Sequence, residues 1–403
     1  MNSIDSLRLI YELYFKKGLP DLDKIQSMGL LAVKIAQIHA LRLDFLPQKT
    51  CEHLAQLYRS NTPVSKEDIE ELITEQGGAT FKNNFSHIDD TPLATASVGQ
   101  VYRATLKNGE QVVIKFIKAH FKKRFVHDVK KVRRFFTMVM FVYPKLQRVG
   151  NPVGILNDIE AYTLAELDLK NEAVGSKILK DIADTYSEKF DLSALYFVKQ
   201  YPELSSENVM VTSYVNAPSV DELLTNKKFT YEDMLKLFYI QGFYIFIVGT
   251  FHGDMHPGNV LYDGKTFTFV DTAFIGTVGD KIRVGLFNFF DALSTYNYPE
   301  CAKWLHEMSD KRISDEKFEI FKNDFLDLYK NYTGSTVSQV SLTRQMMLTI
   351  KLGVNAGMEF EKGIFSIIRS LMYLDGMVLK CNPDAVLVKD MRQFLDAYKS
   401  SMK

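Results

Sequence analysis

The spacing of apolar positions predicts that most of this chain is helical. Apolar residues recur at helical intervals from Gly29 to Ile38, and residues 155–186 have the pattern of one long helix or of a helix pair. The chain after Asp271 also has helical patterns as far as Lys403, with breaks at prolines. No motif with a chemical meaning is apparent in that last stretch.

Strand patterns occupy only short stretches. Residues 101–106 and 111–117 are rich in apolar, β-branched and aromatic side chains, and the turn between them, at residues 107–110, contains an Asn-Gly pair. A further apolar strand covers residues 209–216. The sequence therefore predicts a small sheet embedded in a largely helical protein.

A second hairpin follows the clearest motif of the chain, which is Phe251-His252-Gly253-Asp254-Met255-His256-Pro257-Gly258-Asn259. Two short strands after Asn259 enclose an Asp-Gly turn, and the second strand ends at Asp271. This hairpin returns Asp271 to the neighbourhood of Asn259, and Asp254 lies just before its first strand.

Asp254, Asn259 and Asp271 together have the composition of a phosphoryl-transfer site. Asp254 would lie near the attacking hydroxyl or water, while Asn259 and Asp271 would hold Mg²⁺ against nucleotide phosphates, because a hard cation prefers oxygen ligands. The alternative is a loop whose Asp and Asn only form turns, but the motif is too long a match for that interpretation. His252 and His256 are separated by helix-breaking residues, so we interpret them as loop-shaping residues rather than zinc ligands.

A loop of small residues precedes the first hairpin and would let the backbone approach phosphates; it contains Ala94, Thr95, Ala96 and Ser97. Lys115, in the strand that follows, would pair with the phosphates. A strand lysine is more often simply exposed, but the ordered set of acidic and amide residues later in the chain strengthens this interpretation. In a kinase, the strand at 209–216 connects the lobes and binds adenine, which assigns Ser213 and Val215 to the nucleotide site.

Glu166 and Glu172 lie in the helical stretch 155–186. On one helix they would point about 120° apart, so each should have its own partner. One of them, paired with Lys115, would form the ion pair that kinases need. The alternative is two solvated glutamates.

Composition is ordinary for a globular protein, with 46% hydrophobic and 24% charged residues. Lys+Arg and Asp+Glu both total 49, so no global charge indicates a nucleic-acid partner. Three cysteines without paired spacing fit a reducing compartment, and we expect a cytoplasmic protein. We expect no signal peptide and no transmembrane segment, because the N-terminus lacks the required layout and the most apolar run, 238–251, is too short.

Residues 118–143 combine a basic stretch with an aromatic, apolar one. Such a segment can make peripheral contact with an anionic membrane. A solvated helix face that leads into the core is the alternative, and the pattern alone favours it.

Several motifs, in order over roughly residues 25–290, resemble the UbiB (AarF-type) family of atypical kinase-like proteins. Lys34-Ile35-Ala36-Gln37 is similar to the Lys-x-Gly-Gln signature of that family, and Gln48-Lys49-Thr50-Cys51 to its Gln-Lys-Thr-Asp. Residues 94–97 match its alanine-rich replacement for the kinase glycine-rich loop. Glu166-Leu167-Asp168 matches its Glu-x-Asp, and Glu172 takes the place of the helix C glutamate.

The resemblance implies an α+β, bilobal protein-kinase-like fold whose N-terminal helical extension packs over the active site. We accordingly divide the chain into an extension (1–80), a small lobe with a helical insert (81–216) and a helical large lobe with the catalytic and metal-binding loops (217–403). It also implies ATP and Mg²⁺ as cofactors, and an ATPase or kinase that acts on a small or lipid-related substrate in isoprenoid-quinone or lipid metabolism.

The resemblance further implies a role for each site residue. Asp254, Lys115 and Glu172 would be catalytic. A regulatory lid, in which Lys34 pairs with Glu166, would exclude a protein substrate but admit water or a lipid headgroup; its residues are Lys34, Gln37, Glu166 and Asp168.

The chain departs from the family pattern at three places. Ala36 replaces a glycine, Cys51 replaces an aspartate, and Asp271-Thr272-Ala273 replaces Asp-Phe-Gly. Because Ala273 cannot adopt the backbone states reserved for glycine, the loop geometry and the activity could differ.

Two other functions compete with this one. Aminoglycoside and choline kinases share the His-Gly-Asp-x-His-x-x-Asn pattern, although Lys34, Gln37, Glu166 and Asp168 argue against them. A pseudokinase scaffold, which binds nucleotide or lipid without chemistry, is compatible with the altered loop at Asp271.

Overall fold

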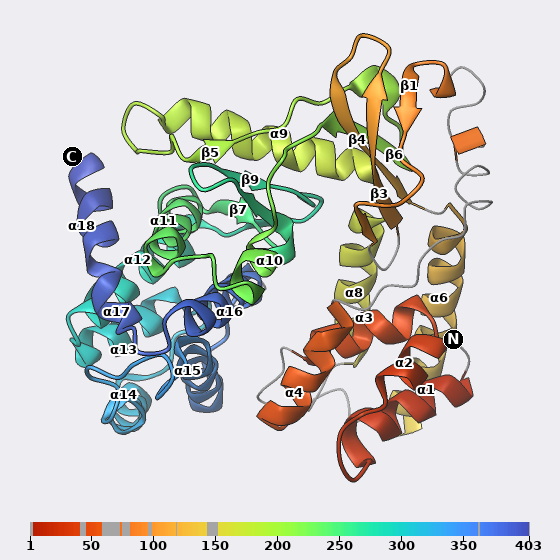
Figure 1. The fold of residues 1–403 in the computed structure, drawn as a ribbon. Coiled ribbons are helices and arrows are strands. Elements are labelled where there is room, and N and C mark those ends of the chain that lie inside the picture. The colour runs from red at the N-terminus through yellow and green to blue at the C-terminus, as the bar shows by residue number, and fades with distance from the viewer. Residues whose placement is uncertain are drawn as a thin grey trace. The chain divides into compact units, whose positions relative to one another are not determined.

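The computed structural model describes residues 3–40, 46–58, 73–74, 81–95, 99–117, 119–142, 152–361 and 363–402 (Figure 1). The chain forms two compact units. Unit 1 consists of Met1–Val174 and Val198–Tyr214, and unit 2 of Gly175–Phe197 and Val215–Lys403.

Unit 1 contains an antiparallel sheet of five strands in the order β1-β3-β4-β6, with β2 paired to β3. The strands are β1 (Phe85–Ile88), β2 (Ala94–Thr95), β3 (Gly99–Leu106), β4 (Gln111–Ile117) and β6 (Val209–Ser213). Val112, Ile114 and Phe116 alternate along β4 and are buried on one face of the sheet. Lys115 therefore lies on the other face, opposite Val101 of β3 and Met210 of β6. The predicted hairpin and the predicted third strand are both confirmed.

The helices of unit 1 share a second apolar core. They are α1 (Ser3–Ile10), η1 (Tyr11–Phe15), α2 (Leu22–Ser27), α3 (Leu30–His39), α4 (Gln48–Leu54), η2 (Ala55–Tyr58), α6 (Ala119–Val142), α8 (Pro152–Glu166) and the start of α9 (Leu169–Tyr186); a short turn, η3 (Pro202–Leu204), precedes β6. Leu31 of α3, Phe125 of α6 and Leu156 of α8 are among the buried side chains of this core. The helical stretch 155–186 is therefore a pair of helices, which is one of the two forms that its pattern allowed.

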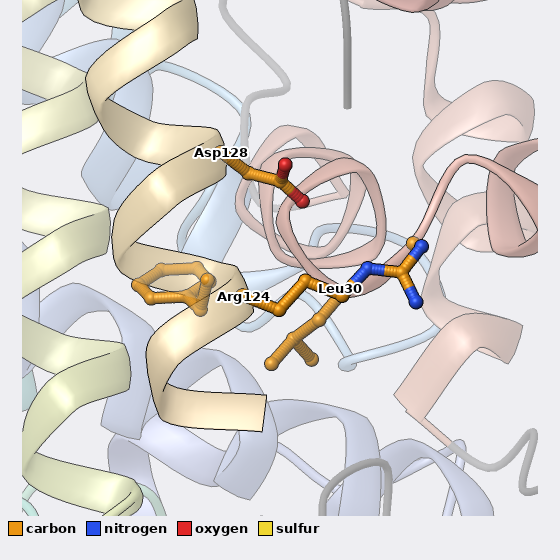
Figure 2. Close-up of a pocket in the computed structure, with 5 residues that line it drawn as sticks. Leu30, Arg124 and Asp128 are labelled. Atoms are coloured by element: carbon orange, nitrogen blue, oxygen red, sulfur yellow. The ribbon is translucent and has the colours of Figure 1, made fainter. Parts of the chain in front are cut away.

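A small cavity of about 50 Å³ lies between α3 and α6. Figure 2 shows Arg124 and Asp128 extending from α6 towards Leu30, at the start of α3. The cavity is lined by Gly29, Leu30, Arg124, Phe125 and Asp128, none of which was predicted as a site residue. A nucleotide needs a pocket of several hundred Å³, so this cavity is a packing gap beneath the N-terminal helices.

Unit 2 is mainly helical and buries a large aromatic core. Its helices are the part of α9 from Gly175 onwards, α10 (Val220–Thr225), α11 (Tyr231–Gly242), η4 (Phe243–Val248), η5 (Pro257–Asn259), α12 (Asp280–Ser294), α13 (Tyr298–Met308), α14 (Asp315–Tyr329), α15 (Leu342–Ala356), α16 (Gly363–Cys381), α17 (Leu387–Asp390) and α18 (Arg392–Ser401). The apolar run before the motif is thus α11 continued by a π-helical stretch, η4, and it ends at Gly249 in the left-handed region (φ 80°). This glycine turns the chain into β7.

Two small sheets position the motif within unit 2. β5 (Leu195–Tyr196), β9 (Phe267–Phe269) and β8 (Val260–Tyr262) form one sheet, and β10 (Ile275–Thr277) pairs with β7 (Thr250–His252) in the other. β8 and β9 are antiparallel across the Asp-Gly turn. The second predicted hairpin is confirmed.

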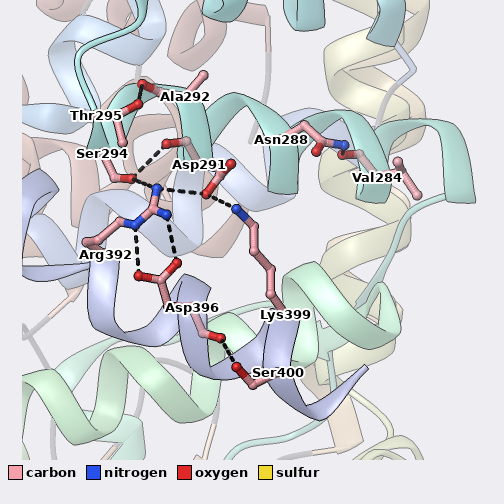
Figure 3. Close-up of polar contacts among 10 residues, drawn as sticks. All are labelled: Val284, Asn288, Asp291, Ala292, Ser294, Thr295, Arg392, Asp396, Lys399 and Ser400. Atoms are coloured by element: carbon pink, nitrogen blue, oxygen red, sulfur yellow. Dashed lines mark hydrogen bonds and ion pairs between the residues drawn. The ribbon is translucent and has the colours of Figure 1, made fainter. Parts of the chain in front are cut away.

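Ion pairs hold the C-terminal helix α18 against α12 (Figure 3). The Asp291 carboxylate accepts hydrogen bonds from Arg392 at 3.1 Å and from Lys399 at 2.5 Å. Arg392 also pairs with Asp396 one turn further along α18. This network lies on elements other than those that carry the motif.

Glu12 is a buried carboxylate that ties η1 to the start of α2. It accepts hydrogen bonds from Lys16 at 2.8 Å, from Lys24 at 3.0 Å and from the Asp21 backbone N–H at 3.0 Å. Burial acts to raise the pKa of Glu12, but these hydrogen bonds outweigh it and lower the pKa to about 2.

Substituting Glu12→Gln should therefore lower the stability of unit 1 at neutral pH by about 2–4 kcal/mol. Because the folded pKa is below the unfolded one, the stabilisation is complete above pH 4.5 and is lost as the pH falls towards 2. Urea unfolding at pH 7 and pH 3 measures both effects, with the exposed Glu203→Gln as the control. A variant that loses equal stability at both pH values would contradict this account.

Candidate active site

The loop between β7 and β8 brings Asp254 and Asn259 together. The Asn259 side-chain N–H donates to the Asp254 backbone carbonyl at 3.1 Å and lies 3.5 Å from Oδ2 of the Asp254 carboxylate. Because this contact uses the amide nitrogen of Asn259, the amide oxygen is the atom that a cation would take. The chemistry of the pair therefore fits one metal-ligating oxygen beside one carboxylate.

The β8–β9 hairpin brings the end of β9 back to Asn259. The Val270 N–H donates to the Asn259 carbonyl at 2.9 Å, and Asp271 follows directly. Asp271 has a φ of 55°, in the left-handed region that few residues other than glycine adopt, although Asp and Asn tolerate it best. The backbone bends away from the strand at Asp271, as is common where a side chain is aimed at a functional site.

His252 connects the two loops. Its Nδ1 accepts a hydrogen bond from the Asp254 N–H at 3.1 Å, so its Nε2 carries the proton and donates to the Val270 carbonyl at 3.1 Å. His252 is fully buried, and burial lowers its pKa, which keeps the ring neutral in this tautomer. This imidazole holds the residues next to Asp254 and Asp271 at a fixed separation, as its interpretation as a loop-shaping residue requires.

Ala273 does not distort the loop in the way that its replacement of a glycine suggests. The non-glycine residues with positive φ in the part of the chain that the structure describes are Lys227, Asp271 and Tyr296. The left-handed residue of the loop is thus Asp271, while Ala273 has an ordinary φ and is buried. The altered signature therefore costs the backbone nothing at Ala273.

In unit 1, Lys115 of β4 forms an ion pair with Glu172 of α9 at 2.7 Å. Both side chains are mostly buried, with exposed fractions of 13% and 7%. The ion pair balances the charge of this buried lysine and limits the conformational freedom of its side chain. This is the pairing that the resemblance implied for kinase-type chemistry.

Lys34 of α3 forms an ion pair with Glu166 at the end of α8, and its ammonium lies 5.5 Å from the centre of the Tyr162 ring. Helix α8 ends before Leu167, and Asp168 caps the next helix, α9, by accepting the Lys170 N–H at 3.1 Å. Glu166 and Glu172 therefore lie on different helices. This break, rather than an angle on one helix, gives each glutamate its own lysine.

The other predicted residues of unit 1 have structural contacts. Gln37 donates from its side chain to the Leu57 carbonyl at 3.1 Å and is buried. Ala94 and Thr95 form β2 and pair with β3, while Ala96 and Ser97 lie outside the described residues. Ser213, the last residue of β6, donates its backbone N–H to the Lys199 carbonyl at 2.9 Å, and its hydroxyl accepts the Lys199 N–H at 3.0 Å. Val215 begins the next segment of unit 2.

Two of the residues that depart from the family pattern, Ala36 and Cys51, are buried in unit 1. Ala36 is fully buried in α3, where it packs among apolar neighbours. The buried Cys51 thiol lies 3.7 Å from the His39 carbonyl and 3.9 Å from the Leu46 carbonyl. Two carbonyl acceptors suit a weak S–H donor and would repel an ionised carboxylate.

Sequence reasoning missed two residues that contact the motif loop, Gln241 and Arg369, and a third, Ser370, that contacts Gln241. Gln241 of α11 donates to the His252 carbonyl and to Ser370, and Arg369 of α16 donates to the Gly253 carbonyl. The one available signal was a lone arginine within an apolar helix, since such a residue usually has a polar partner in the fold.

No three His, Cys, Asp or Glu side chains cluster in a metal-binding arrangement within the described parts of the chain. The candidate donors are the amide oxygen of Asn259 and the carboxylate of Asp271. This oxygen set fits Mg²⁺ and lacks the nitrogen and sulfur ligands that zinc prefers.

The sequence model of the ABC1 atypical kinase-like domain matches residues 56–305, more than half of the chain, so the chain belongs to this family. The probable protein kinase UbiB of Vibrio cholerae is 25% identical over 389 residues, which cover 94% of this chain and 70% of that protein. UbiB of Sodalis glossinidius is 25% identical over 386 residues, covering 93% and 69%. An uncharacterized protein from the hydrogenase 1 5′ region of Clostridium pasteurianum is 23% identical over 381 residues, covering 93% and 69%.

The structure also resembles Rv3197 of Mycobacterium tuberculosis, solved in complex with erythromycin. The TM-score is 0.54 at 18% identity, and the match covers 90% of each chain. The α+β kinase-like fold and the UbiB-like family, both expected from the sequence, are confirmed.

Ala273→Gly should lower stability by about 0.5–1 kcal/mol, because glycine adds freedom to the unfolded chain at a position with an ordinary φ. Urea unfolding measures this difference. Gly357→Ala, at a φ of 103°, should also destabilise and serves as the control for backbone strain. Stabilisation by Ala273→Gly would show that the alanine strains the loop.

Proposed function

We propose that this chain binds Mg-ATP and either hydrolyses it or transfers its terminal phosphoryl group to a small or lipid-related substrate, in isoprenoid-quinone or lipid metabolism. The main observation in support of this proposal is the hydrogen-bonded arrangement of Asp254, Asn259 and the residues before Asp271. The names of the relatives, probable protein kinase UbiB, support phosphoryl transfer.

The Asn259 amide oxygen and the Asp271 carboxylate would hold Mg²⁺. When bound, the cation supplies positive charge that neutralises the nucleotide phosphates. Asn259 is oriented for this role by its N–H contact with Asp254, and Asp271 by the turn of the backbone at its positive φ.

Asp254 would accept the hydrogen bond of the attacking water or hydroxyl and so orient it. Its backbone N–H is fixed by His252 and its carbonyl by Asn259, so the backbone that carries the carboxylate is held in place. Lys115, oriented by Glu172, would contribute an ammonium group to the phosphates.

The ion pair of Lys34 with Glu166 supports the lid role in substrate choice. It connects the N-terminal helices to the helix pair that carries Glu172, so these helices are anchored beside the Lys115 pair within unit 1. We infer that they restrict access to water or a small headgroup rather than a protein substrate.

Two alternatives differ in chemistry. A pseudokinase scaffold would bind nucleotide without turnover. An aminoglycoside- or choline-kinase-like phosphotransferase is disfavoured by the match to the ABC1 family and by the ion pair of Lys34 with Glu166; phosphate release that depends on an added aminoglycoside or choline would favour it.

Asp271→Asn should abolish Mg²⁺-dependent nucleotide binding, because it removes the carboxylate that would hold the cation. A nucleotide at about 100 times its dissociation constant should stabilise the wild type by about 2.7 kcal/mol, or a few degrees in melting temperature. The measurement is a thermal shift with Mg²⁺ and ATP, with phosphate release followed on the same samples.

Asp384→Asn, at an exposed loop position, is the matched control and should behave as wild type. A shift without phosphate release would favour the scaffold. Equal shifts in wild type and Asp271→Asn would remove the basis for the proposed metal site.

We also propose peripheral contact with an anionic membrane through residues 118–143, of which the structure describes 119–142. Exposed basic residues on α6 form no ion pair within the described residues; they are Lys123, Arg124, Lys130, Lys131 and Arg134. The single acid of α6, Asp128, is buried. No helix in the described part of the chain is both long and apolar enough to cross a membrane.

The neighbouring helix α1 packs against α6 and is continued by η1, and together α1 and η1 have an exposed apolar face that supports the same contact. Leu7, Tyr11 and Phe15 are exposed by 55%, 54% and 70% on that face. Apolar and aromatic side chains next to basic ones are the composition of a surface that lies at the headgroup level of a bilayer.

Reversing the charge of Lys130, Lys131 and Arg134 to Glu should weaken binding to phosphatidylserine vesicles about a hundredfold or more, at about 1 kcal/mol for each lost cation. Vesicle co-sedimentation measures the change. The same reversal at Lys228, Lys265 and Lys389 matches the net charge and should bind as wild type. Equal losses in both triple variants would indicate a global charge effect.

A further inference from the structure

Arg369 is the only charged residue between Ile364 and Leu374 of α16. Its Nη2 donates to the Gly253 carbonyl at 2.7 Å, and its guanidinium lies 4.8 Å from the centre of the Phe274 ring. This one side chain therefore contacts two loops of unit 2. A planar guanidinium can donate a hydrogen bond and stack on a ring at the same time.

Gly253 and Phe274 also contact each other. The Gly253 N–H donates to the Phe274 carbonyl at 2.9 Å. A Cβ atom at Gly253 would lie only 2.1 Å from Cδ1 of Phe274, so only glycine lets the ring approach this closely. Gly253, Phe274 and Arg369 thus form a closed set of contacts.

These contacts join the backbone next to Asp254 to the backbone next to Asp271. Gly253 directly precedes Asp254, and Phe274 follows Asp271 by three residues. Each contact limits how far one loop can move relative to the other. A loose loop would misplace the Asp254 carboxylate, and small misplacements are costly in phosphoryl transfer.

The neighbouring residue, Ser370, takes part in a second contact of α16 with the motif loop. Gln241 donates from its side-chain nitrogen to the His252 carbonyl at 3.0 Å and to the Ser370 hydroxyl at 2.9 Å. All three of these side chains are fully buried. Two consecutive carbonyls of the motif, at His252 and Gly253, are therefore fixed by side chains.

We propose that Arg369 is a positioning residue, which holds the Asp254 and Asp271 loops in register and makes α16 a required part of the active site. Residue 369 lies beyond residues 56–305, which the family domain covers. The kinetic part of this inference rests on the proposed function, whereas the structural part does not.

Hydrogen exchange without nucleotide tests the structural part. In Arg369→Ala, the amides of residues 250–255 and 272–277 should exchange about tenfold faster or more, because these loops lose their shared anchor. Arg392→Ala is the matched control, since it also removes a hydrogen-bonded arginine of unit 2, from the network in Figure 3. It should speed exchange in α18 and leave both loops as in wild type.

Turnover tests the kinetic part. Arg369→Ala should lower kcat for ATP hydrolysis about tenfold to a hundredfold. Arg369→Lys, which keeps the charge but loses the planar stack, should be intermediate and provides a second variant if the alanine variant folds poorly. Millimolar guanidinium should restore part of kcat and of the loop protection in Arg369→Ala, and it should change neither quantity in Arg392→Ala, whose loops are intact.

Wild-type loop exchange in both Arg369 variants would overturn the inference, whether or not the chain hydrolyses ATP. Faster loop exchange with unchanged turnover would also overturn it, because the anchor would then not serve the chemistry. A wild type without ATP hydrolysis would contradict the enzymatic form of the proposed function alone, and loop exchange would then decide the positioning role by itself.

Discussion

The neutral imidazole of His252 is the constraint on which the candidate site of unit 2 depends. It accepts the Asp254 N–H and donates to the Val270 carbonyl, so one buried ring joins the motif loop to the hairpin. A protonated ring would have no acceptor for the Asp254 N–H, and burial opposes that state. The tautomer of one histidine thus links the backbone at Asp254 to the backbone next to Asp271.

In unit 1, ion pairs rather than a neutral ring fix the candidate site residues. Two lysines are each balanced by a glutamate. Lys34 pairs with Glu166, before the break between α8 and α9, and Lys115 pairs with Glu172, after it. A buried ion pair adds little net stability but strongly penalises the loss of either partner. The pairs therefore specify the geometry of the helices more than they stabilise them.

The hairpins and the strand that carries Lys115 could be predicted, because their turns and alternation are local signals. The sequence pattern could not decide between one helix and two over 155–186, since the break at Leu167 has no glycine or proline. The contact of Lys34 with Glu166 joins residues far apart in the chain, and only a family resemblance implied it. The partners of Arg369 could not be predicted, because they are a backbone carbonyl and an aromatic ring in distant segments.

Binding of Mn²⁺ in place of Mg²⁺, followed by electron paramagnetic resonance, tests the central claim most directly. The account predicts that the wild type binds one Mn²⁺ tightly when ADP is present, and that Asn259→Leu loses this binding while its fold is unchanged. Tight Mn²⁺ binding by Asn259→Leu, equal to that of the wild type, would contradict the assignment of the cation to Asn259 and Asp271.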